Sequence, residues 1–449
     1  MTPHDSGSVG LVSPISEGAA EAQNAASRFS SGELLERAYV VAALLVFFAV
    51  GLPVIADPGG TTAVTVGADV PTRIARMAIL AVFPVCLLVA QREIVAAIKA
   101  NGLLALMVML ALASYAWSLD KSVTLRSSMI LFASSLFGVY MGTRFTLRTQ
   151  VQLLTWAYAF IVAISCIYVV ATPYGIQPGD YQQAWRGAFI HKNGLGKAMA
   201  LGVLVFWHAA ADAAPRWRII QYAWMIACGA LLILARSAGA LIDVLLTFAV
   251  ISLLPLLRSR RISGWFVGAV VLLGFMVVVS FAAVYWSSLL KVLGKDPTLN
   301  GRTVLWALLL SKISLHPALG YGYDAFWHSS RAFYADIWGI VGWMPPHAHN
   351  GFLNVALDLG YVGVAMLIAV ILRSLGKCFA LLRADAPIAL IQWPLVYMSY
   401  MVVSNLMEVS FLTYANAYWI LFVAAAVSST STLRDVRQLR VASLDSATV

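Results

Sequence analysis

Apolar stretches of about 20 residues recur along the chain, and they constrain its fold more than any other feature of the sequence. A helix of that length crosses the hydrocarbon core of a bilayer and satisfies its own backbone hydrogen bonds there. Only 11% of the residues are charged, whereas about 25% are charged in an ordinary soluble domain. Low charge combined with 61% hydrophobic residues excludes both a solvated enzyme and a disordered chain. The sequence therefore predicts an all-α, polytopic membrane protein.

About twelve apolar segments are predicted to be transmembrane helices, nine within residues 37–286 and three within residues 351–428. A long polar and aromatic loop at 287–350 separates the two groups and is predicted to contain short amphipathic helices. Residues 1–36 are predicted to form a disordered cytoplasmic tail, and residues 429–449 a second cytoplasmic tail. The segments run roughly over 38–56, 74–90, 101–118, 124–141, 151–172, 195–211, 218–235, 238–257, 264–286, 351–372, 388–404 and 408–427.

The basic residues predict the orientation of these segments. An even number of spans places both termini on one side. If that side is the cytoplasm, 17 of the 30 Lys and Arg residues lie inside and 8 lie in short outer segments. The other five lie in the long loop, to which the charge rule does not apply. Both termini are therefore predicted to be cytoplasmic. Because the basic residues occupy short gaps between apolar runs, the net charge of +10 does not indicate a nucleic-acid partner.

Several kinds of soluble-type chemistry lack their sequence motifs in this chain. It contains no HExxH, no GxSxG, no Walker motif and no paired DxD. Metal hydrolases and sugar-nucleotide glycosyltransferases that bind Mg²⁺ through two carboxylates are therefore disfavoured, and no metal site is predicted.

A dense polar stretch follows two prolines where the long loop meets the tenth span. It contains His347, His349, Asn350 and Asn354, with Asp358 one turn further along. A helix N-terminus presents free N–H groups and the positive end of the dipole, which suits an anion and favours a neutral imidazole. A neutral histidine can act as a general base. The alternative is that these side chains cap the helix and bind interfacial water.

Further clusters of hydrogen-bond donors lie on the same predicted outer side. They are Arg186, His191, Lys192 and Asn193 before the sixth span, Arg302 at a predicted helix start in the loop, and Arg236 after the seventh span. Arginine binds phosphate through two parallel hydrogen bonds and keeps its charge when it is desolvated. A lipid-linked pyrophosphate is thus the predicted anion. The alternatives are snorkelling to lipid phosphates, helix capping and an exception to the topology rule.

In these segments the chain resembles the superfamily of O-antigen ligases and Wzy-type polysaccharide polymerases, and it looks most like the exopolysaccharide polymerases of the ExoQ type. The resemblance covers roughly residues 101–430. The ligases carry a histidine followed by ten residues and a glycine, a spacing that His349 and Gly360 match and that favours His349 over His347. The matching segments are Ala116–Arg126, Trp185–Gly196, Gly301–Trp306, Gly320–Trp327 and His347–Asn354.

The resemblance implies a protein of the bacterial inner membrane that uses no cofactor. It implies transfer of a glycan from an undecaprenyl-pyrophosphate carrier to an acceptor hydroxyl. Its implied partners are the lipid-linked donor and acceptor oligosaccharides, membrane lipids, a flippase and a chain-length regulator. In a polymerase the acceptor is a lipid-linked repeat unit, whereas in a ligase, the alternative, it is lipid A core. The ligases tend to have Arg-x-x-x-Leu at a span start, and Arg236 and Leu241 depart from that spacing, which favours a polymerase.

The resemblance also implies roles for the candidate residues. His349 is expected to be the catalytic base in an inverting transfer. Four residues are expected to bind pyrophosphate: Arg302, Arg186, Lys192 and Arg236. Five are expected to support them: His191, Asn193, His347, Asn350 and Asn354. A transporter or flippase is the second alternative; it would use polar groups near mid-bilayer, for which Asp243 is the candidate.

Overall fold

The described residues are almost entirely helical. A computed structural model describes residues 30–50, 70–178, 183–253, 301–328, 335–384 and 388–447. Within these ranges the β-type pairing is one isolated bridge, between Ile176 and Trp185. The helices are α2 (Ser31–Phe47), α4 (Val70–Val89), α5 (Gln91–Ala100), α6 (Gly102–Ala113), α7 (Lys121–Arg144), α8 (Leu147–Ala171), α9 (Lys192–Asp212), α10 (Pro215–Leu234), α11 (Ala238–Ser252), α14 (Arg302–Leu315), α15 (Ala325–His328), α16 (Ala335–Val341), α17 (Gly351–Arg383), α18 (Ile388–Ser404) and α19 (Ala417–Ala447), with 3₁₀ turns at Ser114–Ala116 and Pro173–Gly175.

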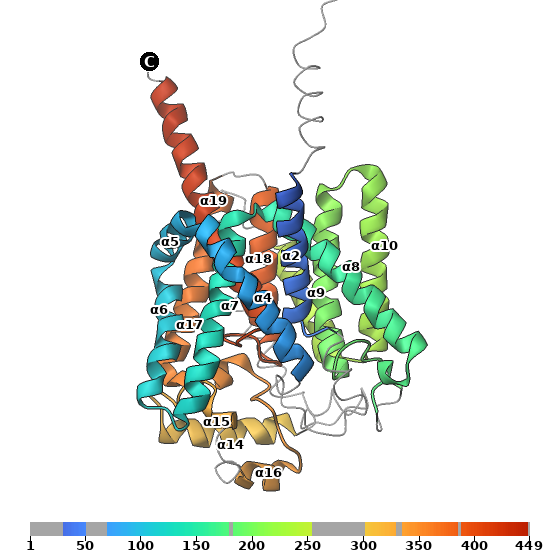
Figure 1. Ribbon diagram of the computed structural model, residues 1–449, viewed down its shortest axis with the longest axis vertical. Coiled ribbons are helices and arrows are strands. Elements are labelled where there is room, and N and C mark those ends of the chain that lie inside the picture. The colour runs from blue at the N-terminus through green and yellow to red at the C-terminus, as the bar shows by residue number, and fades with distance from the viewer. Residues whose placement is uncertain are drawn as a thin grey trace, which may run out of the picture.

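Most of these helices run alongside one another as a bundle, and α14, α15 and α16 lie at the end of the bundle opposite to the C-terminus (Figure 1). Six of the described helices, α4, α7, α8, α9, α10 and α17, are long and apolar enough to cross a membrane. The pair α5 and α6 is bent by 92° and adds a seventh if it counts as one span. The all-α, multi-span prediction is confirmed. The predicted ninth span, 264–286, lies outside the described residues, as do the tail up to residue 29 and the loop from 287 to 300.

The centre of the bundle is the contact between α7 and α19. Glycines at positions 138 and 142 of α7 face α19 so closely that an added Cβ would lie 2.6 Å from the carbonyl oxygen of Ile420 and 2.7 Å from that of Ala424. Small residues four apart allow membrane helices to approach in this way. The indole N–H of Trp419 also donates to the hydroxyl of Ser135 across the contact, at 2.8 Å. The first part of α19 is consequently buried.

Helix α17 breaks at Gly360, and the break docks the loop that follows α14. Gly360 has φ of +65°, a left-handed conformation that glycine adopts without strain. The break frees the carbonyls of Leu357 and Asp358, which accept hydrogen bonds from the amides of Tyr321 and Gly322 at 2.8 and 3.0 Å. The N-terminal part of α17, which begins next to His349, is therefore joined to the loop after α14 by backbone hydrogen bonds.

Substitution of Gly360 by alanine is expected to destabilise the protein by about 2–6 kcal/mol, through left-handed backbone strain and steric overlap together. The added Cβ would lie 2.2 Å from the carbonyl oxygen of Ala318. Gly376→Ala, on the same helix, is the matched control, because its Cβ would meet nothing within 4 Å. Thermal unfolding in detergent checks this expectation. Equal midpoints for the two variants would show that the break does not need a glycine.

Helix boundaries differ from the sequence prediction at α2, α17 and both ends of α19, which continues to Ala447. Helix α2 begins at Ser31, inside the predicted tail, because Ser30 and Glu33 form a reciprocal capping box. Helix α17 continues to Arg383, beyond the predicted end of the tenth span. The last predicted span starts at residue 408, but α19 begins only at Ala417, where the side chain of Asn416 accepts from the first backbone amides. The intervening residues form a turn, which contributes to the site below.

Candidate active site

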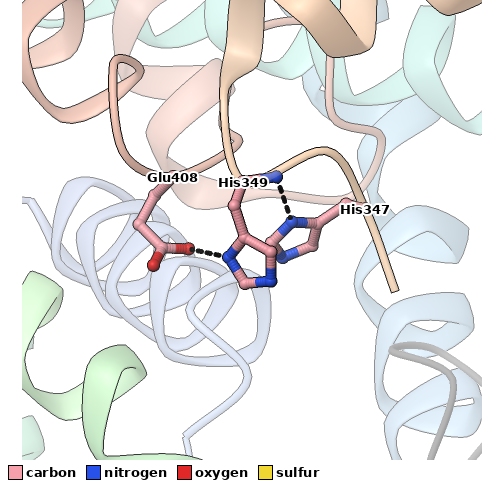
Figure 2. Close-up of side chains that lie close together, drawn as sticks. All are labelled: His347, His349 and Glu408. Atoms are coloured by element: carbon pink, nitrogen blue, oxygen red, sulfur yellow. Dashed lines mark hydrogen bonds and ion pairs between the residues drawn. The ribbon is translucent and has the colours of Figure 1, made fainter. Parts of the chain in front are cut away.

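Four side chains from three separate segments meet at the end of the bundle that carries α14. His347 and His349 come from the loop before α17, Arg302 is the first residue of α14, and Glu408 lies in the turn between α18 and α19. Figure 2 shows His349 between His347 and Glu408. The Nδ1 atom of His349 lies 3.7 Å from Oε2 of Glu408, and the two histidine rings are 4.3 Å apart between centroids. The structure thus brings together His349 and Arg302, the two most important predicted residues.

Arg302 clamps the turn that carries Glu408. Its Nη1 donates to the backbone carbonyl of Met407 at 2.6 Å, and its Nη2 donates to Oε1 of Glu408 at 2.9 Å. Burial alone would raise the pKa of Glu408, but the neighbouring His349 and the charge of Arg302 outweigh burial and hold that pKa well below its usual range. Glu408 is therefore ionised at neutral pH and offers a fixed negative charge to Nδ1 of His349.

His349 has an uncommon backbone conformation and a nearly buried ring. Its backbone φ is +49°, which is uncommon for a residue with a side chain and is typical of strained functional positions. Neither ring nitrogen has a hydrogen-bond partner among the described residues, although the ring is almost buried beside Trp343. Because Nδ1 faces the Glu408 carboxylate, we assign the proton of the neutral ring to Nδ1. Nε2 is then left as a proton acceptor.

Two further histidines stand in the same cluster in neutral form. Burial, together with the adjacent His349, lowers the pKa of His347 to about 3. Burial also lowers the pKa of His191 to about 4, although the charge of Glu408 opposes this. The Nδ1 atoms of His347 and His191 accept backbone hydrogen bonds from His349 and Asn193, so Nε2 of each ring carries the proton. Both rings can donate a hydrogen bond to an anion.

The predicted supporting residues Asn350 and Asn354 hold the histidine loop in place. The side chain of Asn350 caps α17 by accepting from two backbone amides and donates to the carbonyl of Leu406, in the Glu408 turn. Asn354 accepts from the amide of Ala348, between the two histidines, and from the indole of Trp327. The capping alternative raised from the sequence therefore describes Asn350, and both residues act through the backbone of the site.

Arg186 is buried and donates to backbone carbonyls in this conformation. It is 1% exposed, and its Nε and Nη1 donate to the carbonyls of Tyr174 and Ile190 at 2.7 and 3.1 Å. These contacts organise the loop that leads into α9. Its contact with pyrophosphate stays a prediction. Asn193 is partly buried, and its backbone amide donates to the side chain of His191, which caps α9.

Lys192 and Arg236 lie at or just before the starts of α9 and α11. Lys192 opens α9 beside His191, and its charge acts on that imidazole. Arg236 is exposed in the turn between α10 and α11, with φ of +49°. Gly239, three residues later, approaches Met407: a Cβ there would lie 3.9 Å from that of Met407. The start of α11 thus borders the Glu408 turn.

The aromatic residues of the loop divide into two groups. The side chains of Tyr321, Tyr323 and Trp327 are buried and cannot stack on a sugar in this conformation. Trp306 donates from its indole to the carbonyl of Ala348 and so supports the histidine loop. The ring of Trp343 lies beside that of His349, with 5.5 Å between their centroids.

Sequence reasoning missed Glu408 and the buried Lys197. Glu408 was assigned to the start of the last span, where its charge was not given a role. A carboxylate inside an apparently apolar segment was the signal, because ionisable residues in such segments usually mark functional sites. Lys197 lies in α9 and hydrogen-bonds to Ser410 at 2.5 Å.

His347, His349 and Glu408 are also the described group whose donor atoms could hold a metal ion, since all lie within 4.8 Å of one another. The sequence motifs gave no indication of such a group. The single carboxylate in it is already bound by Arg302. A divalent cation would have to approach a guanidinium and a nearby lysine, whereas an anion would be attracted by them.

Parts of the chain are similar in sequence to known proteins. Residues 223–368, which include Arg302 and both site histidines, match a family described as O-antigen ligase. The exopolysaccharide production protein ExoQ of Rhizobium meliloti (strain 1021) is 26% identical over 283 residues, which make up 60% of this chain and 63% of ExoQ. Two proteins provisionally named polysaccharide ligases, from Rickettsia felis and Rickettsia prowazekii, are each 27% identical over 92 residues, or 19% of this chain and 22% of each relative. The resemblance to the O-antigen ligase family and to ExoQ is confirmed, although the matched part spans less than two thirds of ExoQ.

Proposed function

We propose that this relative of ExoQ and of the O-antigen ligases is an exopolysaccharide polymerase of the bacterial inner membrane. It transfers glycan from an undecaprenyl-pyrophosphate carrier onto a lipid-linked repeat unit, with inversion and without a metal ion. The site faces the periplasm and both termini are cytoplasmic, in keeping with the charge bias of the short loops. A flippase that delivers the repeat unit and a chain-length regulator are its proposed partners.

One observation carries this proposal: a histidine with an unpartnered Nε2 stands between an ionised carboxylate and a group of cationic or neutral donors. Glu408 orients His349, while Arg302, Lys192 and the Nε2–H groups of His191 and His347 surround it with positive potential. That combination suits a hydroxyl that must lose a proton beside a leaving group that gains negative charge.

The proposed reaction proceeds in one displacement. The acceptor hydroxyl oxygen attacks the anomeric carbon from the face opposite to the phosphate. Its proton passes to Nε2 of His349, whose imidazolium form is stabilised by Glu408. The bond between the anomeric carbon and the phosphate oxygen breaks, and its electron pair leaves with the pyrophosphate. The remaining N–H groups of Arg302, together with Lys192 and Arg236, stabilise that charge.

An O-antigen ligase is the second candidate, favoured by the family that matches residues 223–368. The glycan profile of a deletion strain separates the two. Loss of high-mass secreted polysaccharide is the result that the polymerase proposal predicts. Bare lipid A core, with polymer still on the lipid carrier, would instead make the protein a ligase. Unchanged glycans in both fractions would contradict either function.

Glu408→Gln is expected to lower turnover by about 10²–10⁴-fold, a loss comparable to that of general-base assistance. The glutamine oxygen can still accept from Arg302, but its NH₂ group would then donate to Nδ1 of His349. That hydrogen bond moves the ring proton to Nε2 and removes the base. Initial rates and donor KM measured from pH 5 to 9 check this, with Asp336→Asn as a control carboxylate that pairs with Lys312. Turnover within twofold of the unsubstituted protein would remove Glu408 from the mechanism.

A further inference from the structure

A lysine side chain lies buried in the bundle, in contact with the turn that carries Glu408. Lys197, in α9, is 8% exposed, and its Nζ donates to the hydroxyl of Ser410 at 2.5 Å. The ammonium also lies 4.7 Å from the centre of the Tyr418 ring. Burying an ammonium in a membrane protein is costly, so such a residue is retained mainly where it has a role. The proposed mechanism does not use it.

The hydroxyl that Lys197 holds belongs to the turn that carries Glu408. The backbone amides of Ser410 and Phe411 both donate to the side-chain oxygen of Asn405, at 2.8 and 3.0 Å. The amide of Glu408 donates to the carbonyl of Ser404 at 2.9 Å. The turn is thus closed on itself, and Lys197 joins it to α9 through Ser410, in addition to the contacts from Arg302.

A second buried charge balances the ammonium. Asp243 of α11 is 2% exposed, and its Oδ1 has no hydrogen-bond partner among the described residues. The charges of Asp243 and Glu408 both act on Lys197. An unpaired charge in the interior of a protein is strongly destabilising, whereas a compensated set is tolerated. Asp243 therefore has an electrostatic partner, which accounts for its presence in an apolar helix.

We propose that Lys197 is a positioning residue of this active site: through Ser410 it holds the turn that presents Glu408 to His349, while Asp243 balances its charge inside the bundle. This inference rests on the proposed function of the His349 site. It gives Lys197 and Asp243 a role in positioning the site. Asp243 considered alone would instead suggest a transport pathway.

The charge of Lys197 also reaches the imidazoles. His347 is faced by His349, Glu408, Lys197 and Arg302, and the charge of Lys197 contributes to its low pKa. Removing that positive charge raises the pKa of His347 and makes its protonation easier. A variant without the ammonium is therefore expected to lose activity at a higher pH on the acid side than the unsubstituted protein. A purely structural lysine would leave that limb in place.

The test compares Lys197→Met, Asp243→Asn and the double variant. Each single variant leaves one buried charge without its partner, so reduced folded yield is expected for both. The double variant removes both charges and is expected to recover thermal stability. Its turnover per folded molecule is expected to stay about 10–10²-fold below that of the unsubstituted protein, because the Glu408 turn is no longer fixed. Its acid limb is expected at higher pH.

Two controls make the outcome decisive. Lys377→Met removes another largely buried lysine, whose partners Asn101 and Thr430 are not residues of the site. This variant is expected to change stability without moving the pH profile. Ser410→Ala keeps both charges and cuts only the link to the turn. It is expected to lower kcat with little change in donor KM.

Full turnover in both the double variant and Ser410→Ala, together with an unshifted pH profile in the double variant, would overturn the role of Lys197. His349→Ala, measured in the same assay, separates this failure from a failure of the proposed function. If His349→Ala is inactive while the Lys197 variants are fully active, only the positioning role is wrong. If His349→Ala is fully active, the proposed site itself is wrong.

Discussion

His349→Ala is expected to lower turnover by about 10²–10⁴-fold, the usual contribution of general-base assistance. Its Nε2 is the unpartnered acceptor of the site, and its Nδ1 faces Glu408 at 3.7 Å. Donor binding is expected to persist, because Arg302 and Lys192 remain in place. Initial rates with purified protein and lipid-linked oligosaccharide, together with donor KM, measure the two effects separately.

His347→Ala is the matched control for that variant. His347 supports the loop by accepting from the amide of His349 at 3.2 Å, and its ring can donate only from Nε2. A milder loss is expected, together with some loosening of the loop. If His347→Ala were the more damaging of the two, the assignment of the base to His349 would be wrong.

Arg302→Lys is expected to lower turnover by about 10²–10³-fold, the loss typical of removing a donor to developing charge. Lysine keeps the charge but loses the planar fork that reaches the Met407 carbonyl and Glu408 together. The Glu408 turn loses its clamp, and the pyrophosphate loses a bidentate partner. Turnover and protein level in membranes are the quantities to compare.

The same replacement at Arg144 provides the control. Arg144 binds Glu36 through two nitrogens, at 2.8 and 2.9 Å, and so joins α7 to α2 as Arg302 joins α14 to the Glu408 turn. Arg144→Lys is expected to leave turnover per folded molecule unchanged. Equal losses for the two variants would mean that Arg302 matters only for folding.

The fold class could be predicted from the sequence because the length of an apolar segment is a local property, and a segment of about 20 residues matches the thickness of the bilayer. It also favoured His349 over His347 by spacing, and the structure shows what lies at the other end of that spacing. Gly360 is where α17 breaks to dock the loop after α14, so its distance from His349 fixes the length of the N-terminal part of α17. The sequence shows only the spacing between His349 and Gly360. It does not show that Gly360 has φ of +65° or that a backbone carbonyl lies against it.

What the sequence could not give were contacts between distant segments. Glu408 lies in a stretch that is apolar enough to be assigned to a span. In the structure this stretch is the turn between α18 and α19 and not part of a helix. Nothing in the sequence near Arg186 revealed that its guanidinium donates to the carbonyls of Tyr174 and Ile190. Asp243 suggested transport until its neighbour Lys197, on another helix, explained its charge.

The central claim is that this chain extends a lipid-linked glycan with its own side chains. The most direct measurement incubates the purified protein with one lipid-linked oligosaccharide in EDTA and resolves the products by length. The account predicts a ladder of lipid-linked products that grows by whole repeat units and is lost in His349→Ala. Polymerisation that stops in EDTA and returns with Mg²⁺ would instead assign the His347, His349 and Glu408 cluster to a metal ion and contradict the account.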